Sequence, residues 1–326
     1  MQITDSAGTA VHQHGSPART LRMIALAVLA LGFLEIAALR LLGIDGNRIT
    51  AALLALTPYV AVGGLLLGGV SLAFRHWWIG GVVLVVAIAL VGMLLPRAFA
   101  SAQPVAHGPK LRVMSSNQYL GKADVASVVR LVRENQVDVL NLLELTPREA
   151  AALERAGLFQ LLPYRVFKPQ FGGAGSGIAS RYPLTELSLT GPSRMEQPSA
   201  RVDVHGTAVE VVAVHPIPPT TDPQEWKKEM AGLPRPNPGG TVRILAGDFN
   251  STVDHATFRD LLDAGYTDAG LSRGEGFKPT WPSSFFPPPV TIDHVLVDPR
   301  VAVDGYRVLD VPDSDHHAVL AEVSLP

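Results

Sequence analysis

The sequence predicts an α/β (α+β) protein in which a two-sheet sandwich flanked by helices follows three transmembrane helices. Three observations lead to this prediction. Charged residues make up only 17% of the 326 residues, below the roughly 25% that is usual in soluble domains. Long apolar runs are concentrated in the first hundred positions. After residue 110, short apolar segments with strand character alternate with segments of helical periodicity.

The membrane region is predicted to span residues 19–97, after a disordered polar tail at 1–18. Its three spans are expected at about residues 23–42, 49–74 and 77–95. Each run is close to the ~20 residues with which a helix crosses the hydrocarbon layer, and Trp77 and Trp78 stand where an interfacial aromatic belt would lie. The alternative is a set of buried helices in a soluble core, but three such runs in succession exceed what a soluble domain needs.

The orientation prediction rests on a few charged residues. Three spans place the two chain termini on opposite sides of the membrane. Arg19 and Arg22 precede the first span and favour a cytoplasmic N-terminus, which puts the C-terminal region outside the cell. Residues 98–109 are interpreted as a linker. Glu35 lies within the first span, where an ionisable group is costly and therefore a candidate for a functional role.

The charge distribution restricts the class of partner. Residues 1–100 hold six of the 27 Lys/Arg and three of the 29 Asp/Glu, which leaves a net charge of −5 on the rest of the chain. Nucleic-acid binding normally needs a basic surface, so this balance disfavours it. The absence of cysteine excludes disulfides, thiolate metal sites and cysteine nucleophiles.

Residues 110–326 are predicted to form the second domain. It begins with a strand at 111–116, a helix through Val125–Val132, a buried strand at 137–143 and a Thr146-capped helix that ends at Gly157. The remaining strands are expected at 177–180, 201–205, 208–214, 243–246, 291–297 and 318–325, and a further helix is expected from an Asp254 cap to Gly265. Proline-rich stretches at 216–223, 233–240 and 282–289 are interpreted as surface loops.

Polar residues that can carry chemistry cluster at the ends of these apolar strands. They are Asn117, Glu144, His215, Asp248 with Asn250, Asp293, and Asp315 with His316. If they gather at one rim of the sheets, they form an acidic pocket that also bears imidazoles. Carboxylate and amide oxygens suit Mg²⁺ or Mn²⁺, imidazoles can stabilise charge on a phosphoryl group, and a carboxylate can activate water.

Each of these residues also has a purely structural interpretation. Asp248 and Asn250 can form an Asx turn after a strand, Asp293 can cap an element, and His215 can be an ordinary strand-end histidine. His294 and His317 neighbour motif residues and can equally point into the core. Their joint occurrence at successive strand ends favours a site over this set of separate explanations.

The order of these motifs resembles the endonuclease/exonuclease/phosphatase superfamily, whose members share the deoxyribonuclease I-like fold. The resemblance covers about residues 111–326 and includes the segment Ser176–Pro183. It implies one or two divalent ions, Mg²⁺ or Mn²⁺, bound by Glu144 with Asn117 and Asp315 close by. It further implies that Asp248 activates water, Asn250 orients water or phosphate, His215 and His316 contact phosphoryl oxygens, and Asp293 holds the His316 tautomer.

The combination of three spans, this domain and a His-Pro pair at 215 resembles a membrane-bound branch that includes the actinobacterial teicoplanin-resistance proteins. That resemblance implies a lipid-phosphate substrate, undecaprenyl pyrophosphate, hydrolysed outside the cell in a process linked to antibiotic resistance. Two alternatives stay open: a membrane-tethered nuclease or other phosphodiesterase, and a catalytically silent domain that binds a phospholipid head group.

Overall fold

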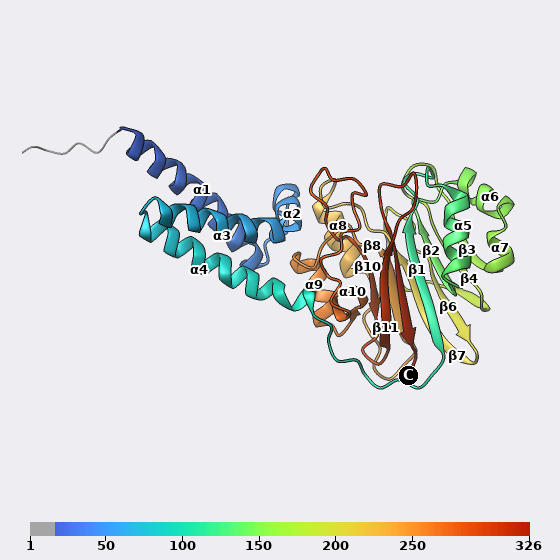
Figure 1. Ribbon diagram of the computed structural model, residues 1–326. Helices are drawn as coiled ribbons and strands as arrows, with labels where there is room; N and C mark the ends of the chain where they lie inside the picture. The colour runs from blue at the N-terminus through green and yellow to red at the C-terminus, as the bar shows by residue number, and fades with distance from the viewer. Residues whose placement is uncertain (1–16) are drawn as a thin grey trace, which may run out of the picture.

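The computed structural model describes residues 17–326 and divides into an elongated helical part and a two-sheet sandwich (Figure 1). Almost all of the tail predicted at 1–18 lies outside the described residues. The helices α1, α3 and α4 lie together at one side of the sandwich, and α2 lies between them and the sandwich.

The helical part differs from the predicted three spans. The helices α1 (Pro17–Leu42) and α4 (Trp77–Leu94, continued by the 3-10 helix η1, Leu95–Ala98) are each long and apolar enough to cross a membrane. The run predicted as one span at 49–74 is instead two helices, α2 (Arg48–Ala55) and α3 (Thr57–Ala73), bent by 70°. Two helices therefore qualify on their own, and a third span exists only if the bent pair is counted as one.

The bend has a local cause in the sequence. Asn47 caps α2 with its side chain, which accepts hydrogen bonds from Ile49 and Thr50. Pro58 sits in the first turn of α3, where its missing N–H favours a new helix start rather than continuation of the previous helix. An uncharged run is therefore divided into a short helix and a longer one.

The three long helices pack through small residues. Gly68 of α3 faces Leu84 of α4 so closely that a Cβ at this glycine would lie 2.5 Å from the Leu84 Cγ. Close backbone approach through small residues is typical of helix packing in lipid. Large apolar side chains such as Leu66 and Val85 remain exposed on the outer faces.

The predicted two-sheet sandwich is confirmed. The first sheet has the order β11-β12-β1-β2-β4-β3, formed by Ala302–Leu309, Ala318–Ser324, Lys110–Asn117, Val139–Leu143, Ser176–Ser180 and Tyr164–Lys168. The second has the order β5-β6-β7-β8-β10-β9, formed by Leu184–Leu187, Ser199–Val204, Thr207–Val214, Val242–Asp248, Asp293–Val297 and Thr267–Asp268. The valine-rich inner faces of both sheets bury the central core.

Helices cover the outer faces of the sandwich. Against the first sheet pack α5 (Val125–Glu134), α6 (Pro147–Arg155) and α7 (Leu158–Leu161). Against the second pack α8 (Pro223–Ala231) and α9 (Ala256–Asp263), and the short α10 (Ala269–Ser272) lies beside β10 and β11.

The strands that the sequence analysis missed all lie at the edges of the two sheets. All eight interior strands were predicted, whereas the four missed strands, β3, β5, β9 and β11, are the four edges of the two sheets. The helix expected from an Asp254 cap begins instead at Ala256, because the Asp254 carboxylate pairs with two arginines. The capping box predicted at Thr146 is half formed: Thr146 accepts the Glu149 N–H, but the Glu149 carboxylate has no partner among the described residues.

The helical part is tied to the sandwich by buried polar contacts. Asp254, in the loop after β8, accepts hydrogen bonds from Arg40 of α1 and Arg97 of η1. The His255 ring contacts the Ala51 carbonyl of α2 at 2.9 Å. The predicted linker is also bound to the sandwich, for example by the Ser101 N–H, which donates to the Ser272 carbonyl. The helices and the sandwich are thus held in a defined relationship.

Candidate active site

The predicted site residues gather at one rim because neighbouring strands end together. The parallel strands β1 and β2 pair Asn117 with Leu143, so Glu144 follows beside Asn117. The parallel strands β7 and β8 pair Val214 with Gly247, which brings the next residues, His215 and Asp248, to the same edge. Strand register alone therefore assembles half of the site.

The antiparallel partners complete the rim. Strand β10 pairs its first residue, Asp293, directly with Asp248 of β8. His316 lies just before β12, and the Ser314 hydroxyl anchors this approach by donating to the Asn117 carbonyl at 2.8 Å. The two sheets thus contribute side chains to one space.

The end of β8 is shaped by a glycine and a turn. A Cβ at Gly247 would overlap the Val214 backbone, so only glycine permits this close strand approach. The Asp248 Oδ1 accepts the Asn250 N–H at 2.8 Å, and Asn250 has a φ of 50°. The Asx-turn interpretation is therefore correct as local geometry, and the turn also directs Asn250 toward the site cavity.

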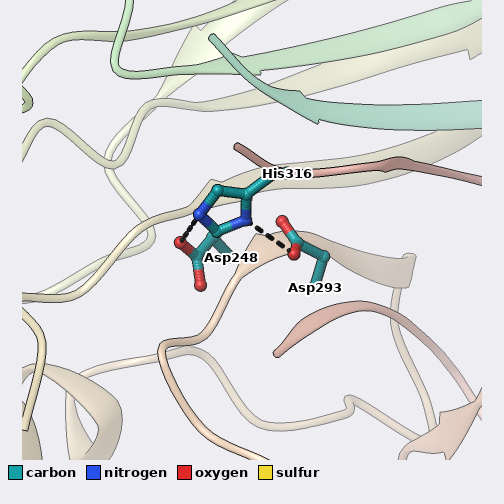
Figure 2. Close-up of side chains that lie close together, drawn as sticks. All are labelled: Asp248, Asp293 and His316. Atoms are coloured by element: carbon teal, nitrogen blue, oxygen red, sulfur yellow. Dashed lines mark hydrogen bonds and ion pairs between the residues drawn. The ribbon is translucent and has the colours of Figure 1, made fainter. Parts of the chain in front are cut away.

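Asp248, Asp293 and His316 form the centre of the site (Figure 2). The His316 Nδ1 lies 2.9 Å from Asp293 Oδ2, and its Nε2 lies 3.7 Å from Asp248 Oδ2. All three side chains are buried. The ring is thus held between two carboxylates, one of which fixes its orientation.

The two site histidines have opposite electrostatic surroundings. Burial alone would lower the pKa of His316, but the charges of Asp293 and Asp248 raise this pKa to about 10, so the ring is cationic at neutral pH. Burial and, to a smaller extent, the nearby His316 cation lower the pKa of His215 to about 4. The His215 ring is therefore neutral, with Nε2 3.9 Å from Glu144 Oε1 and 4.0 Å from Asp248 Oδ2.

The carboxylates repel one another at the rim. Burial raises the pKa of Asp248 to about 7, and the negative charge of Asp293 contributes to the rise. Burial likewise raises the pKa of Glu144. The Asn117 amide partly relieves this repulsion, since its Nδ2 lies 3.2 Å from both Glu144 Oε1 and Asp248 Oδ2.

This donor set fits a hard divalent cation. Ligand-type atoms of Asp248, Asp293 and His316 lie within 4.8 Å of one another, and because the His316 ring is cationic, the donors of this group are the carboxylates. Asn117 connects Asp248 to the predicted ligand Glu144. The Asp293 Oδ1 is buried and has no hydrogen-bond partner among the described residues. Positive charge would stabilise the ionised forms of Asp248 and Glu144, whose pKa values are raised, and would give the Asp293 oxygen a partner. Oxygen ligands suit Mg²⁺ or Mn²⁺.

The site opens into a cavity of about 490 Å³. One part is polar and is lined by Glu144, His215, Asp248, Asn250, Asp315 and His316. The other part is apolar and is lined by residues of three separate segments: Ala51, Ala52, Ala55 and Leu56; Pro218 and Pro219; and Pro287, Pro288, Val290 and Ile292. The first of these segments belongs to α2 and its end, so the helical part supplies a wall of the cavity.

The structure brings together all eight predicted site residues and separates the secondary candidates from them. His294 is held by Asp268 and the Ser251 carbonyl, at 2.7 and 3.0 Å, and packs against Phe258. His317 lies 3.5 Å from Asp310. Arg181 contacts Asp138, and Arg201 contacts Glu210. Glu35 is exposed on α1.

Some residues of the site were not found by sequence reasoning. The Trp281 indole N–H donates to Asp315 Oδ2 at 3.2 Å, and Trp281 lines the cavity. The alanines of α2 have no chemical signature in a sequence. Trp281 directly precedes the proline-rich stretch at 282–289, which the sequence indicates only as a surface loop. This position is the one feature of the sequence that could have pointed to Trp281 as a site residue.

The sequence profile of the endonuclease/exonuclease/phosphatase family matches residues 114–316, a segment that contains all eight predicted site residues. The chain belongs to this family. Members of the endonuclease/exonuclease/phosphatase family hydrolyse phosphoester bonds and generally depend on divalent metals. Among curated proteins, none matches this chain.

Solved structures support the fold of the family. An endonuclease/exonuclease/phosphatase from Beutenbergia cavernae is 20% identical, with a TM-score of 0.53, over 66% of this chain and 72% of its own. A humanized D. rerio TDP2 is 18% identical, with a TM-score of 0.53, over 66% and 99%. An AP endonuclease from Archaeoglobus fulgidus is 16% identical, with a TM-score of 0.52, over 65% and 98%.

Proposed function

We propose that this family member is a membrane-anchored, metal-dependent phosphohydrolase that acts on a lipid-linked phosphate. One observation carries the proposal: the catalytic rim and an apolar wall from α2 line the same cavity. A phosphate group suits the polar part, and a hydrocarbon chain suits the alanines and prolines of the other part. If α1 and α4, each long and apolar enough to span a membrane, do so, this cavity would lie beside the lipid phase.

The residues of the rim have distinct tasks in the proposed reaction. Water attacks phosphorus, the bond from phosphorus to the leaving oxygen breaks, and Asp248 accepts a proton from the water. A pKa of about 7 suits Asp248 as a base at neutral pH. Asn250 orients the water or the phosphate. Cationic His316, held by Asp293, neutralises charge on a phosphoryl oxygen, and neutral His215 donates a hydrogen bond there.

The metal is expected to be held by Glu144, with Asn117 and Asp315 beside it. Bound Mg²⁺ or Mn²⁺, as one or two ions, supplies Lewis-acid stabilisation of the phosphoryl oxygens. The remaining chemistry belongs to the side chains above. Asp315 is in turn oriented by Trp281.

For the substrate, we propose undecaprenyl pyrophosphate, which water would convert to undecaprenyl phosphate and inorganic phosphate. If the bent pair α2–α3 is counted as a third span, the chain crosses the membrane an odd number of times. A cytoplasmic N-terminus, which Arg19 and Arg22 at the start of α1 favour, would then put the catalytic domain outside the cell. Recycling of this envelope lipid carrier would connect the protein to glycopeptide (teicoplanin) resistance.

The test is a substrate panel with the full-length protein in detergent. The panel comprises a polyprenyl pyrophosphate, a soluble phosphodiester and plasmid DNA, each with Mg²⁺ and with EDTA, beside His316→Ala. We expect the protein to release phosphate from the lipid, and we expect both EDTA and the His316→Ala substitution to abolish this release. If the purified protein releases no phosphate from a polyprenyl pyrophosphate with Mg²⁺ present, the proposed substrate is wrong.

A membrane-tethered nuclease is the second candidate. The structures similar to this chain include D. rerio TDP2 complexed with a single-strand DNA product, at a TM-score of 0.52. The net charge of −5 after residue 100 disfavours a nucleic-acid partner. Plasmid nicking that disappears in Asp248→Ala would favour the nuclease over the lipid phosphohydrolase.

A further inference from the structure

Two phenylalanines project from the loop between Pro282 and Pro289. The side chains of Phe285 and Phe286 are 96% and 85% exposed. Adjacent exposed aromatic residues are costly in water, and such surfaces mark sites of contact with proteins or membranes. The tip of this loop is therefore a candidate interaction surface.

The loop is held in place at its base. Trp281 and Val290 form an antiparallel bridge, in which each backbone N–H donates to the carbonyl of the other residue. The Ser283 backbone N–H donates to the Asp315 carbonyl at 2.7 Å, and the Ser283 hydroxyl donates to the Ser314 carbonyl at 3.0 Å. The two phenylalanines are thus presented by a braced loop next to the catalytic rim.

The same loop is joined to the helical part. The Tyr59 hydroxyl, in the first turn of α3, donates to the Pro289 carbonyl at 2.7 Å. Tyr59 begins an exposed stripe on one face of α3, continued by Val62, Leu66 and Val70 at helical spacing. An outward apolar stripe that starts with tyrosine is typical of a helix in lipid, with the aromatic ring at the head-group level.

We propose that Phe285 and Phe286 insert into the boundary between head groups and acyl chains of the membrane that surrounds α3. The surface formed by these two residues continues the lipid-facing stripe of α3 through the Tyr59–Pro289 contact. On its inner side, Pro287 and Pro288 of the same loop line the catalytic cavity together with Ala52 and Ala55. A lipid-linked phosphate can therefore pass from the bilayer into the cavity between the loop and α2, and this path rests on the proposed function.

Depth-dependent quenching in proteoliposomes tests the insertion. Because the chain has no cysteine, Phe285→Cys can be labelled at a single place with an environment-sensitive fluorophore. Val62→Cys serves as the lipid-facing reference. Phe171→Cys is the matched control, since Phe171 is 88% exposed on a loop beside the edge strand β3. We expect doxyl-labelled lipids to quench the label at 285 as they do at 62, and aqueous iodide to quench the label at 171.

Two outcomes would overturn the proposal. A label at 285 that iodide quenches as strongly as the label at 171 would place the loop in water. A label at 285 shielded from both quenchers would indicate a protein partner, including a second copy of this chain. The measurement uses no substrate, so its result is independent of whether the protein hydrolyses lipid phosphates.

A second measurement connects the loop to turnover. In proteoliposomes, the double variant Phe285→Ser/Phe286→Ser should lower kcat/KM for a polyprenyl pyrophosphate by about tenfold, because bilayer contact is lost. Hydrolysis of the soluble bis(4-nitrophenyl) phosphate should be unchanged. Equal kcat/KM values of the parent and the double variant for the lipid would contradict the access path. If neither protein hydrolysed the lipid, the proposed function would be contradicted instead.

Discussion

Arg97 binds Asp254 with both ends of its guanidinium group: Nη2 lies 2.6 Å from Oδ1 and Nη1 lies 2.8 Å from Oδ2. The Arg40 Nε adds a third contact at 2.7 Å, and all three side chains are buried. Although burial alone would raise the pKa of Asp254, the two arginines lower it. Asp254 lies six residues after Asp248, so this ion cluster connects the helical part to the catalytic strand.

Asp254→Ala should separate the helical part from the sandwich. The substitution leaves two buried arginines without their anion, and breaking a buried pair in this way costs about 3–5 kcal/mol. We expect a marked fall in the Tm of the detergent-solubilised protein. The control is Glu186→Ala, whose 2.8 Å ion pair with Lys168 joins two exposed side chains and whose loss should leave the Tm unchanged. Equal Tm values for the two variants would show that Asp254 does not stabilise the interface.

Ala52→Trp tests the role of α2 as a wall of the active site. Ala52 is exposed and lines the apolar part of the cavity, so a large ring there should obstruct a hydrocarbon chain but not a small ester. We expect KM for a polyprenyl pyrophosphate to rise about tenfold, the equivalent of ~1.4 kcal/mol, with unchanged hydrolysis of bis(4-nitrophenyl) phosphate. Ala73→Trp, at the exposed far end of α3, is the matched control. A uniform loss on both substrates would contradict a role in chain binding.

The polar rim of the candidate site could be predicted from the sequence because strand ends carry both the apolar pattern and the polar residue that follows it. Asp248 ends β8 and Glu144 follows β2, and parallel neighbours then place such residues side by side. The edge strands were not predictable in this way. In β5 and β3 most side chains are exposed or half-buried, so their sequences lack the buried apolar run that identifies an interior strand.

The relation between the helices and the site was also beyond the sequence. A run without charge from residue 49 to 74 has the composition of one span, and the contact of α2 with His255 is visible only in three dimensions. In the sequence, Arg40 is only a charged residue that interrupts an apolar run, and Asp254 is only a residue of the type that caps helices. Their partnership joins positions 214 residues apart, which no local pattern encodes.

Asp293→Asn should change the pH dependence of the reaction. Asp293 and Asp248 hold the pKa of His316 at about 10, so neutralising Asp293 lowers that pKa. The cationic ring exists only below its pKa, and therefore the alkaline limb of the pH–rate profile should move to lower pH. The control is Asp268→Asn, which removes the carboxylate from the other buried pair, His294–Asp268 at 2.7 Å. An alkaline limb that moves equally in both variants would argue against His316 as the titrating group.

Glu149→Gln should stabilise the protein at alkaline pH. Burial raises the pKa of Glu149 from 4.5 to about 8, and repulsion from Glu144 contributes; neither carboxylate oxygen has a partner among the described residues. Between these pH values the folded protein holds a proton that the unfolded chain has lost, so the free energy of unfolding falls as pH rises through the window. Glutamine carries no such proton. The free energy of unfolding of the variant should therefore exceed that of the parent by on the order of 2 kcal/mol at pH 8 and equal it near pH 4. The measurement is Tm as a function of pH.

Glu154→Gln is the control, because Glu154 is exposed on the same helix. Its Tm should change with pH as that of the parent does. The same dependence of Tm on pH in all three proteins would contradict a buried, protonated Glu149.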